Sequence, residues 1–185
     1  MQTDEELAQG VQRGNRDDLA VLVERHHSPL LGFLYRMTGG DRALAEDLVQ
    51  ESLVRLLRGI HQYVYPRPFK PWLYQIATNL TRDHYKRADT RHTESMPEDA
   101  LSLGAADEPQ PEAALLLRSE ARQVAAAIRE LPEHQREVVI FRYYQEFSLA
   151  EIADALNIPV GTVKSRLSIG LKRLRIVWLE QEREL

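Results

Sequence analysis

The segment Thr93–Glu112, "TESMPEDALSLGAADEPQPE", constrains the fold more than any other part of this 185-residue chain. It holds six acidic residues, three prolines and no basic residue. A stretch this polar cannot bury enough apolar surface to offset the entropy lost on ordering. The sequence therefore predicts a flexible acidic linker over residues 93–112. It separates an N-terminal block, about 1–92, from a C-terminal block, about 113–185.

Outside this linker the apolar residues recur at helical spacing, and no alternating apolar and polar run indicates a strand. The predicted fold class is therefore all-α, with two small helical domains joined by the linker. Asp41 is a candidate N-cap for one of the N-terminal helices. The predicted helices cover residues 17–37, 41–58 and 71–87 in the N-terminal block. In the C-terminal block they cover 112–130 and 132–144, followed by a short helix and a basic helix that begins near residue 160.

The sequence "FSLAEIADALNIPVGTVKSRL" contains the strongest local signal. Ser148 and Glu151 form the pattern S-x-x-E of a capping box, which opens a short helix. Asn157 and Pro159 end this helix, and another begins near Val160. Two helices joined by a short turn, the second rich in basic residues, are typical of a DNA-binding helix-turn-helix.

The stretch "PVGTVKSRLSIGLKRLR" holds five basic residues and no acidic one, although the net charge of the chain is −4. At about 100° per residue, one arc of this helix is apolar and predicted to be buried. The opposite face has short polar groups at its centre and cations on both sides, which suits a major groove. A merely solvated helix usually carries acidic partners, and none occurs from 160 to 179. The predicted buried arc is Val163, Leu167, Gly170, Leu171, Leu174 and Trp178, and the predicted DNA-facing residues are Lys164, Ser165, Arg166, Ser168, Ile169, Lys172, Arg173 and Arg175.

In "AEDLVQESLVRLLR", Asp47, Gln50, Glu51 and Val54 share the face opposite the leucines. A solvated face is the default interpretation, and no histidine stands at metal-ligand spacing from the two carboxylates. An apolar Val54 among polar groups favours a protein-binding surface instead.

In "PFKPWLYQIATNLTRDHYKR", the helical spacing predicts that Asn79, Lys86 and Arg87 point outward. The preceding loop, His61–Lys70, is rich in proline and aromatic residues. Aromatic side chains beside a basic helix can stack on unpaired bases. The alternative is that most of these aromatic residues belong to the core.

Four segments follow one another along the chain: "AEDLVQE", "PFKPWLYQIATNL", the acidic linker and "LPEHQREVVIFRYYQEFSLAEIADALNIPVGTVKSRL". In this order they closely resemble the sigma-70 family of bacterial RNA polymerase initiation factors. The two-domain form resembles the extracytoplasmic-function (ECF) subfamily, over residues 4–178. The resemblance implies a cytoplasmic sigma factor that binds core RNA polymerase, through its β′ clamp helices and β flap, and promoter DNA. It also implies an anti-sigma factor, which the sequence does not identify.

The resemblance further implies roles for individual residues. Residues 1–92 match sigma region 2 and residues 113–185 match sigma region 4. Ile169 stands where family members often carry Arg, so no family promoter sequence can be transferred. The implied core-polymerase contacts are Asp47, Gln50, Glu51 and Val54. The implied contacts that recognise and melt the minus-ten element are Tyr63, Tyr65, Phe69, Lys70, Asn79, Lys86 and Arg87. The helix containing "GTVKSRL" would read the minus-thirty-five element and adds Thr162 to the DNA-facing residues.

The sequence offers no catalytic motif, so we expect neither an enzyme nor a cofactor, metal or small-molecule substrate. It lacks cysteine, which fits a reducing cytoplasm, and its six histidines show no metal-ligand spacing. No stretch approaches the roughly 20 apolar residues that insertion in a membrane requires. Two other classes remain: a helix-turn-helix regulator, which would bind duplex DNA alone, and a helical bundle that binds a metal or ligand.

Overall fold

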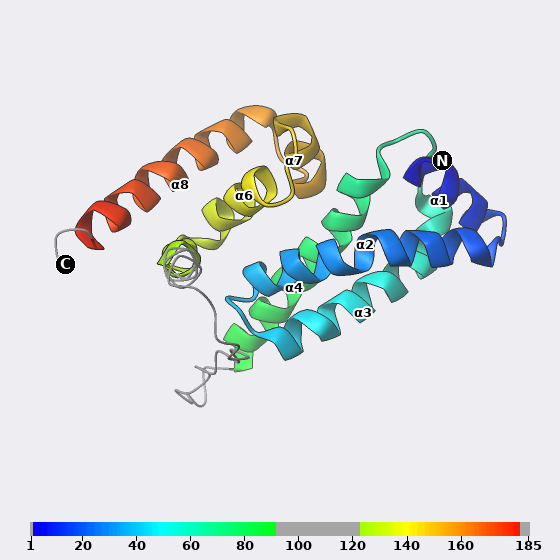
Figure 1. The fold of residues 1–185 in the computed structure, drawn as a ribbon, viewed down its shortest axis with the longest axis horizontal. Coiled ribbons are helices and arrows are strands. Elements are labelled where there is room, and N and C mark those ends of the chain that lie inside the picture. Colours follow the sequence, from blue (N-terminus) through cyan, green and yellow to red (C-terminus); the bar gives the residue numbers. More distant parts are fainter. Residues whose placement is uncertain (1, 92–122, 182–185) are drawn as a thin grey trace, which may run out of the picture.

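The computed structural model describes residues 2–91 and 123–181. The predicted linker and the first part of the predicted helix 112–130 lie outside the described residues. Within the described ranges, all regular secondary structure is helical (Figure 1). The predicted all-α fold class is confirmed.

Three long helices form the N-terminal bundle: α2 (Arg16–Met37), α3 (Arg42–Gly59) and α4 (Phe69–Arg91). Between α2 and α3 the chain turns at Gly39 and Gly40, whose φ angles of 70° and 97° favour glycine. The side chain of Asp41 then caps α3 by accepting a hydrogen bond from Leu44 N at 2.9 Å. The predicted first and last residues of these helices agree with the structure to within one residue, except at the ends of α4. This helix starts two residues before the predicted residue 71 and runs past residue 87.

One α-helix, α1 (Asp4–Gln12), was not predicted from the sequence. Thr3 and Glu6 form a capping box at its start, with backbone-to-side-chain hydrogen bonds of 2.9 and 3.2 Å. The helix packs on α2 and buries Leu7 and Ala8. The pattern T-x-x-E at residues 3–6 was the signal that could have revealed it.

The C-terminal part contains a helical stretch at residues 123–129, followed by α6 (Glu133–Tyr143), α7 (Leu149–Leu156) and α8 (Val160–Gln181). The predicted capping box at Ser148 and Glu151 is present, with hydrogen bonds of 2.8 and 3.2 Å. Helix α7 ends at Asn157 in the left-handed conformation, with φ of 52°.

Helices α6 and α8 approach each other closely at Gly170. A Cβ atom at Gly170 would lie only 3.3 Å from Val139 Cγ2 and 3.4 Å from Gln135 Cβ. A larger residue would therefore push α8 away from α6. Since α7 also packs on α8, this glycine helps to fix the angle at which the helix-turn-helix is held.

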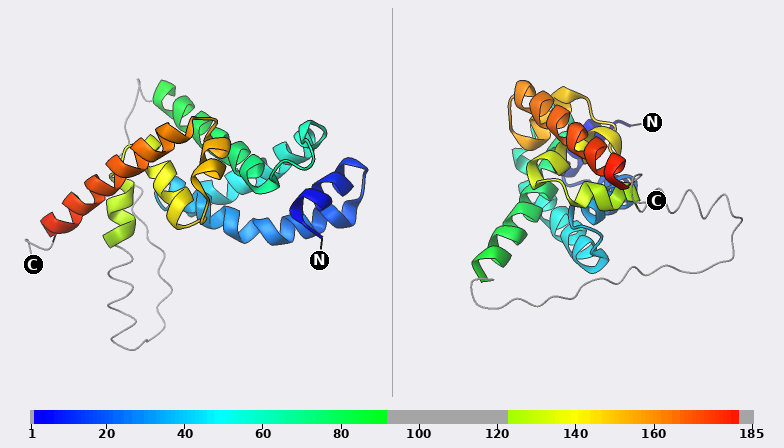
Figure 2. Two further views of the ribbon diagram at one scale, coloured as in Figure 1. Left: turned by 90° about the horizontal axis from the view of Figure 1, so that it is seen from above. Right: turned by 90° about the vertical axis from the view of Figure 1, so that its left-hand side faces the viewer.

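The two helical groups pack against each other, with α7 against α4 and α6 against α2 (Figures 1 and 2). Four aromatic side chains meet at this junction, each at most 1% exposed: Phe33, Tyr74, Phe141 and Phe147. The Phe33 ring lies 4.8 Å from that of Phe141, and the Tyr74 ring lies 5.3 Å from that of Phe147. The described residues therefore share one continuous core, although they fall into two sequence blocks.

Candidate nucleic-acid interface

The second helix of the helix-turn-helix, α8, presents the polar face that the sequence predicts. Lys164, Ser165, Ser168 and Lys172 are exposed, as are Arg173, Arg175 and Ile169, while Thr162 and Arg166 are half-buried. Ile169 is 46% exposed, so an apolar side chain does lie within this face. Among the described residues, no ion pair involves any of the five cations of α8. Their charges are therefore available to phosphate groups.

The opposite side of α8 packs on α6 and α7. Val163 and Gly170 are buried, and Leu167 and Leu174 are half-buried against the core. The prediction for Leu171 is wrong, because its side chain is 37% exposed. Leu171 lies about 100° around the helix from the buried Gly170, at the edge of the arc, whereas Leu174 further along α8 still packs against the core. The ribbon of α8 beside α6 and α7 is seen in Figure 2. The side chain of Trp178, the last residue of the predicted arc, lies outside the described residues.

Helix α3 carries a second exposed surface. Asp47, Gln50 and Val54 are exposed on one face, and Val54 is 39% exposed. Glu51 is half-buried and forms an ion pair with Arg55, with 3.0 Å between Oε1 and Nε. In the view of Figure 1, α3 lies on the side of the bundle away from α8. The exposed face of α3 and that of α8 therefore belong to helices on different sides of the molecule.

The loop before α4 places two of its predicted contact residues in the core. Tyr63 is 4% exposed and Phe69 is 0% exposed, and both rings pack against Trp72 at 5.3 and 5.9 Å. Burial raises the pKa of Tyr63 to about 12, with a further contribution from the negative charge of Glu5. In this arrangement neither ring offers a free face on which a base could stack.

The other predicted minus-ten residues lie at the surface. Tyr65 is 45% exposed, beside Val64 at 68%. Asn79, Lys86 and Arg87 are exposed on α4, as the helical spacing predicts. Lys70 is the exception, since it is half-buried at the junction with the C-terminal helices.

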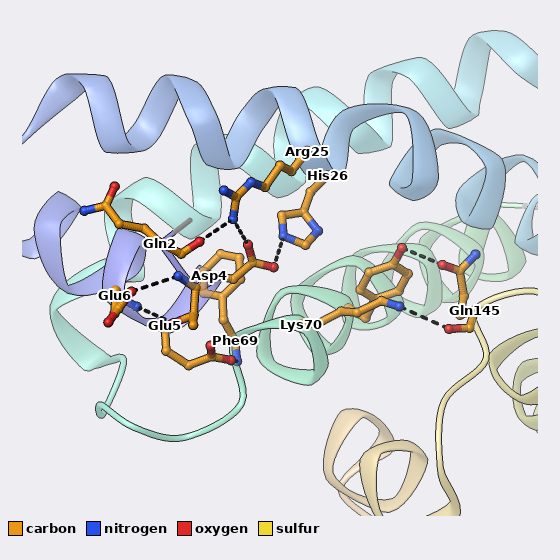
Figure 3. Close-up of polar contacts among 11 residues, drawn as sticks. Gln2, Asp4, Glu5, Glu6, Arg25, His26, Phe69, Lys70 and Gln145 are labelled. Atoms are coloured by element: carbon orange, nitrogen blue, oxygen red, sulfur yellow. Dashed lines mark hydrogen bonds and ion pairs between the residues drawn. The ribbon is translucent and has the colours of Figure 1, made fainter.

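Polar contacts across the junction were missed by the sequence analysis. Lys70 Nζ donates to the backbone oxygen of Gln145 at 3.1 Å, and Tyr74 donates its hydroxyl proton to Gln145 Oε1 at 2.6 Å (Figure 3). Burial raises the pKa of Tyr74 far above its ordinary value, so this hydroxyl stays protonated as a donor. No local pattern could reveal these contacts, because their partners stand more than 70 residues apart.

The strongest of these contacts joins Arg82 of α4 to Glu137 of α6. Nε and one terminal nitrogen of the guanidinium donate to the two carboxylate oxygens at 2.7 and 2.6 Å. The side chain of Glu137 is 1% exposed and that of Arg82 is 35% exposed. Hydrogen bonding to the carboxylate raises the pKa of Arg82 above its already high value. This bidentate pair therefore holds α6 on α4 with defined geometry.

The described residues bring together no three His, Cys, Asp or Glu side chains that could hold a metal ion. Over the same ranges, no helix combines the length and apolar character needed to cross a membrane.

A helix-turn-helix with unpaired cations on its second helix, joined to a helical bundle with a separate exposed face, defines an all-helical DNA-binding protein. Two family descriptions match the chain: "Sigma-70 region 2" over residues 22–91, and "Sigma-70, region 4" over residues 121–174. The chain belongs to the sigma-70 family of RNA polymerase sigma factors, as a member of the ECF type that directs RNA polymerase to promoters. Sigma factors of this family bind RNA polymerase and DNA and are not enzymes.

Curated relatives cover almost the whole chain. The ECF RNA polymerase sigma factor SigW of Bacillus subtilis is 36% identical over 173 residues, which is 89% of this chain and 91% of SigW. The ECF RNA polymerase sigma-E factor of Escherichia coli is 33% identical and matches 89% of this chain and 88% of its own length. The RNA polymerase sigma-H factor of Pseudomonas aeruginosa is 31% identical over similar shares, 89% and 88%.

Two solved structures share the fold. CnrH, in complex with the cytosolic domain of CnrY, superimposes with a TM-score of 0.71 at 25% identity, covering 95% of this chain and 96% of that one. The sigma factor RpoE of Bartonella quintana, in complex with the anti-sigma factor NepR, gives a TM-score of 0.69 at 21% identity, covering 88% and 95%.

Proposed function

We propose that this sigma factor engages its polymerase and its promoter through three separate surfaces. The exposed polar face of α8 reads the minus-thirty-five element, α4 with its preceding loop recognises and melts the minus-ten element, and the face of α3 docks on the β′ clamp helices of core polymerase. The observation that carries this proposal is the face of α8, whose five cations have no ion-pair partner among the described residues.

Within α8 we propose a division between sequence reading and charge. Thr162, Lys164, Ser165, Arg166 and Ser168 lie near the N-terminal end, which enters the groove in helix-turn-helix proteins. Lys172, Arg173 and Arg175 lie further along and meet the phosphate backbone. Ile169 stands between the two groups and is suited to contact a thymine methyl group.

For the minus-ten element, burial divides the predicted residues into two roles. Exposed Tyr65 and Asn79 are the candidates for capturing an unpaired base, with Lys86 and Arg87 near the phosphates. Buried Tyr63 and Phe69 support the loop from beneath and do not stack on bases. Lys70 becomes available to DNA only when its contact with Gln145 is broken.

Asp47, Gln50, Glu51 and Val54 remain the proposed polymerase contacts on α3, while the C-terminal domain meets the β flap. The domain boundaries proposed are 1–92 and 113–185, with the acidic linker 93–112 between them. We further propose a cytoplasmic location and control by an anti-sigma factor. Support for such control comes from the similar fold of RpoE of Bartonella quintana, which was solved with the anti-sigma factor NepR.

This function requires the two packed domains to separate. The two promoter elements lie about 25 base pairs apart, which is about 85 Å along B-DNA. A compact chain of this length is only about 40 Å across. The 20 residues of the predicted linker, 93–112, span up to about 70 Å when extended, which together with the width of the two domains is enough to bridge the gap. We therefore propose that the packed arrangement opens when the protein joins polymerase on a promoter.

The experiment that tests the proposal measures holoenzyme affinity for a set of minus-thirty-five variants at several salt concentrations. Arg173→Ala should weaken binding to every variant alike and lower the salt slope by about one. Arg166→Ala should instead cost about 1–3 kcal/mol at one preferred base pair and relax the preference there. If both substitutions weaken all variants by the same factor, α8 supplies charge alone and does not read sequence.

A further inference from the structure

Helix α1 holds both ends of the loop that precedes α4. The amide nitrogen of Gln12, at the C-terminal end of α1, donates to the backbone oxygens of Ile60 and Tyr63, each at 2.7 Å. At the other end of the loop, Glu5 Oε1 accepts a hydrogen bond from Phe69 N, the first residue of α4, at 3.1 Å (Figure 3). Three side-chain-to-backbone contacts from one helix therefore set where the loop begins and ends.

Helix α1 is itself firmly attached to the bundle. The Asp4 carboxylate accepts a hydrogen bond from Arg25 Nη1 at 2.9 Å, and its second oxygen lies 2.7 Å from His26 Nε2 (Figure 3). Leu7 and Ala8 are buried beneath it. Both polar contacts of Asp4 go to α2, and α1 as a whole packs mainly on α2. The bundle therefore sets the position of α1, and α1 can transmit that position to the loop.

The loop between these two anchors is closed by internal hydrogen bonds, and its middle residues face solvent. Arg67 N donates to Val64 O at 2.9 Å, and the Tyr63 hydroxyl donates to Arg67 O. The buried Tyr63 ring forms the floor, so Val64 and Tyr65 are directed away from the core. Where Tyr65 stands relative to Asn79 on α4 therefore depends on the anchors at residues 60, 63 and 69.

We propose that Gln12 is a positioning residue for minus-ten recognition. It touches no DNA and acts by holding the carbonyl groups of Ile60 and Tyr63, so that the loop presents Tyr65 in one fixed place. The inference rests on the proposed function of the loop in minus-ten recognition. It assigns a role to a helix that lies outside the matched family segments, since the region 2 match begins at residue 22.

The substitution Gln12→Glu tests the chemistry of this contact. Glutamate has nearly the same shape as glutamine, but its ionised carboxylate cannot donate a hydrogen bond. It would place a negative charge against two carbonyl oxygens, which would release the start of the loop. Gln9→Glu is the matched control: it makes the same change of charge on the same helix, and no side-chain hydrogen bond of Gln9 is seen among the described residues.

Open-complex formation is measured with core polymerase on a promoter selected from a random library by the wild-type holoenzyme. We expect Gln12→Glu to reduce it about tenfold, which corresponds to about 1.4 kcal/mol. Gln9→Glu should leave it unchanged. Tyr65→Ala should also reduce it, and the double variant Gln12→Glu/Tyr65→Ala should be no worse than Tyr65→Ala alone, because Gln12 acts through the loop.

Each other outcome overturns a stated part of the proposal. If Tyr65→Ala impairs opening but Gln12→Glu behaves like Gln9→Glu, the loop acts and Gln12 does not position it. If Tyr65→Ala has no effect, the proposed function of the loop fails, and the inference fails with it. If the defects of Gln12→Glu and Tyr65→Ala multiply, Gln12 acts elsewhere in the fold. Should Gln12→Glu fail to fold, Gln12→Met removes the same donor without adding charge and is compared with Gln9→Met.

Discussion

The ion pair between Arg82 and Glu137 offers a direct test of whether the packed domains separate. Glu137 is fully buried at the junction, and its carboxylate receives two hydrogen bonds from Arg82. Arg82→Met keeps the apolar stem of the side chain but removes both donors. While the domains stay packed, the carboxylate of Glu137 is then left in the core without its partner.

Removing one partner of a buried ion pair costs about 3–5 kcal/mol. Because the Arg82 side chain is 35% exposed, we take the lower end, about 3 kcal/mol. A free energy of this size changes an equilibrium by more than 100-fold. If the domains can separate, opening returns Glu137 to water and avoids the cost. We therefore expect Arg82→Met to favour the open form while each domain stays folded.

The absence of cysteine makes the measurement simple, because introduced cysteines are the sole labelling sites. Labels at Glu24 on α2 and Asp154 on α7, both exposed, report the distance between the domains by energy transfer. Arg82→Met should lower the transfer efficiency at a temperature where circular dichroism still shows full helicity. Arg42→Met, which removes the exposed ion pair with Glu46 on α3, should leave the transfer efficiency unchanged.

A double variant isolates the pair from other effects of the substitution. Arg82→Met/Glu137→Met replaces a buried ion pair by apolar side chains of similar volume, which is often neutral or stabilising. It should restore the high transfer efficiency of the packed form. The reasoning is refuted if Arg82→Met lowers only the melting temperature of a single cooperative transition, with energy transfer constant until the whole chain unfolds.

Three further predictions concern the surfaces and the core. Asp47→Lys/Glu51→Lys should weaken binding to core polymerase with helicity unchanged, and unchanged affinity would remove α3 as the docking face. Asn79→Ala should slow open-complex formation on duplex promoters and matter much less on a template already melted at the minus-ten element; equal defects on both would place its role in packing. Because the pKa of Tyr63 is raised to about 12, the folded state keeps its proton between pH 10 and 12 while the unfolded state loses it, so stability should fall as pH rises through this window. Tyr63→Phe should flatten that fall in chemical denaturation, and an unchanged slope would contradict the assignment.

Local patterns in the sequence predicted most of the helices because each helix carries its own start or stop signal. The S-x-x-E pattern at Ser148 and the N-cap at Asp41 act within one turn of helix, and both occur as expected. The same kind of signal stands at Thr3, where it was overlooked, and with α1 the contacts of Gln12 and Glu5 were missed too. The exposed residues of α3, α4 and the start of α8 were predicted because helical spacing alone decides which face is apolar.

The sequence could not decide the burial of residues whose surroundings depend on distant parts of the chain. In the loop before α4, no repeating period shows which side is buried, so the sequence left open whether Tyr63 and Phe69 contact DNA or pack in the core, where they lie against Trp72. Leu171 stands at the edge of the apolar arc of α8, and how much of that arc α6 and α7 cover is decided by packing. Such facts belong to tertiary packing and require the structure.

Most of the surface residues proposed to read DNA stay exposed in the packed arrangement. Packing would therefore limit promoter binding in another way than by burying them. Tyr65 and Asn79 are exposed, as are Lys164, Ser165 and Ser168 on α8. The distance that the two DNA-binding surfaces must span, and not burial of these residues, would therefore limit binding. A promoter with both elements demands separation of the domains, whereas a promoter with a scrambled minus-thirty-five element does not. Arg82→Met lowers the cost of separation, so we expect it to strengthen holoenzyme binding to the two-element promoter more than to the scrambled one. An equal gain on both DNAs would mean instead that packing acts by covering part of the minus-ten surface, for which Lys70 in its contact with Gln145 would be the first residue to test.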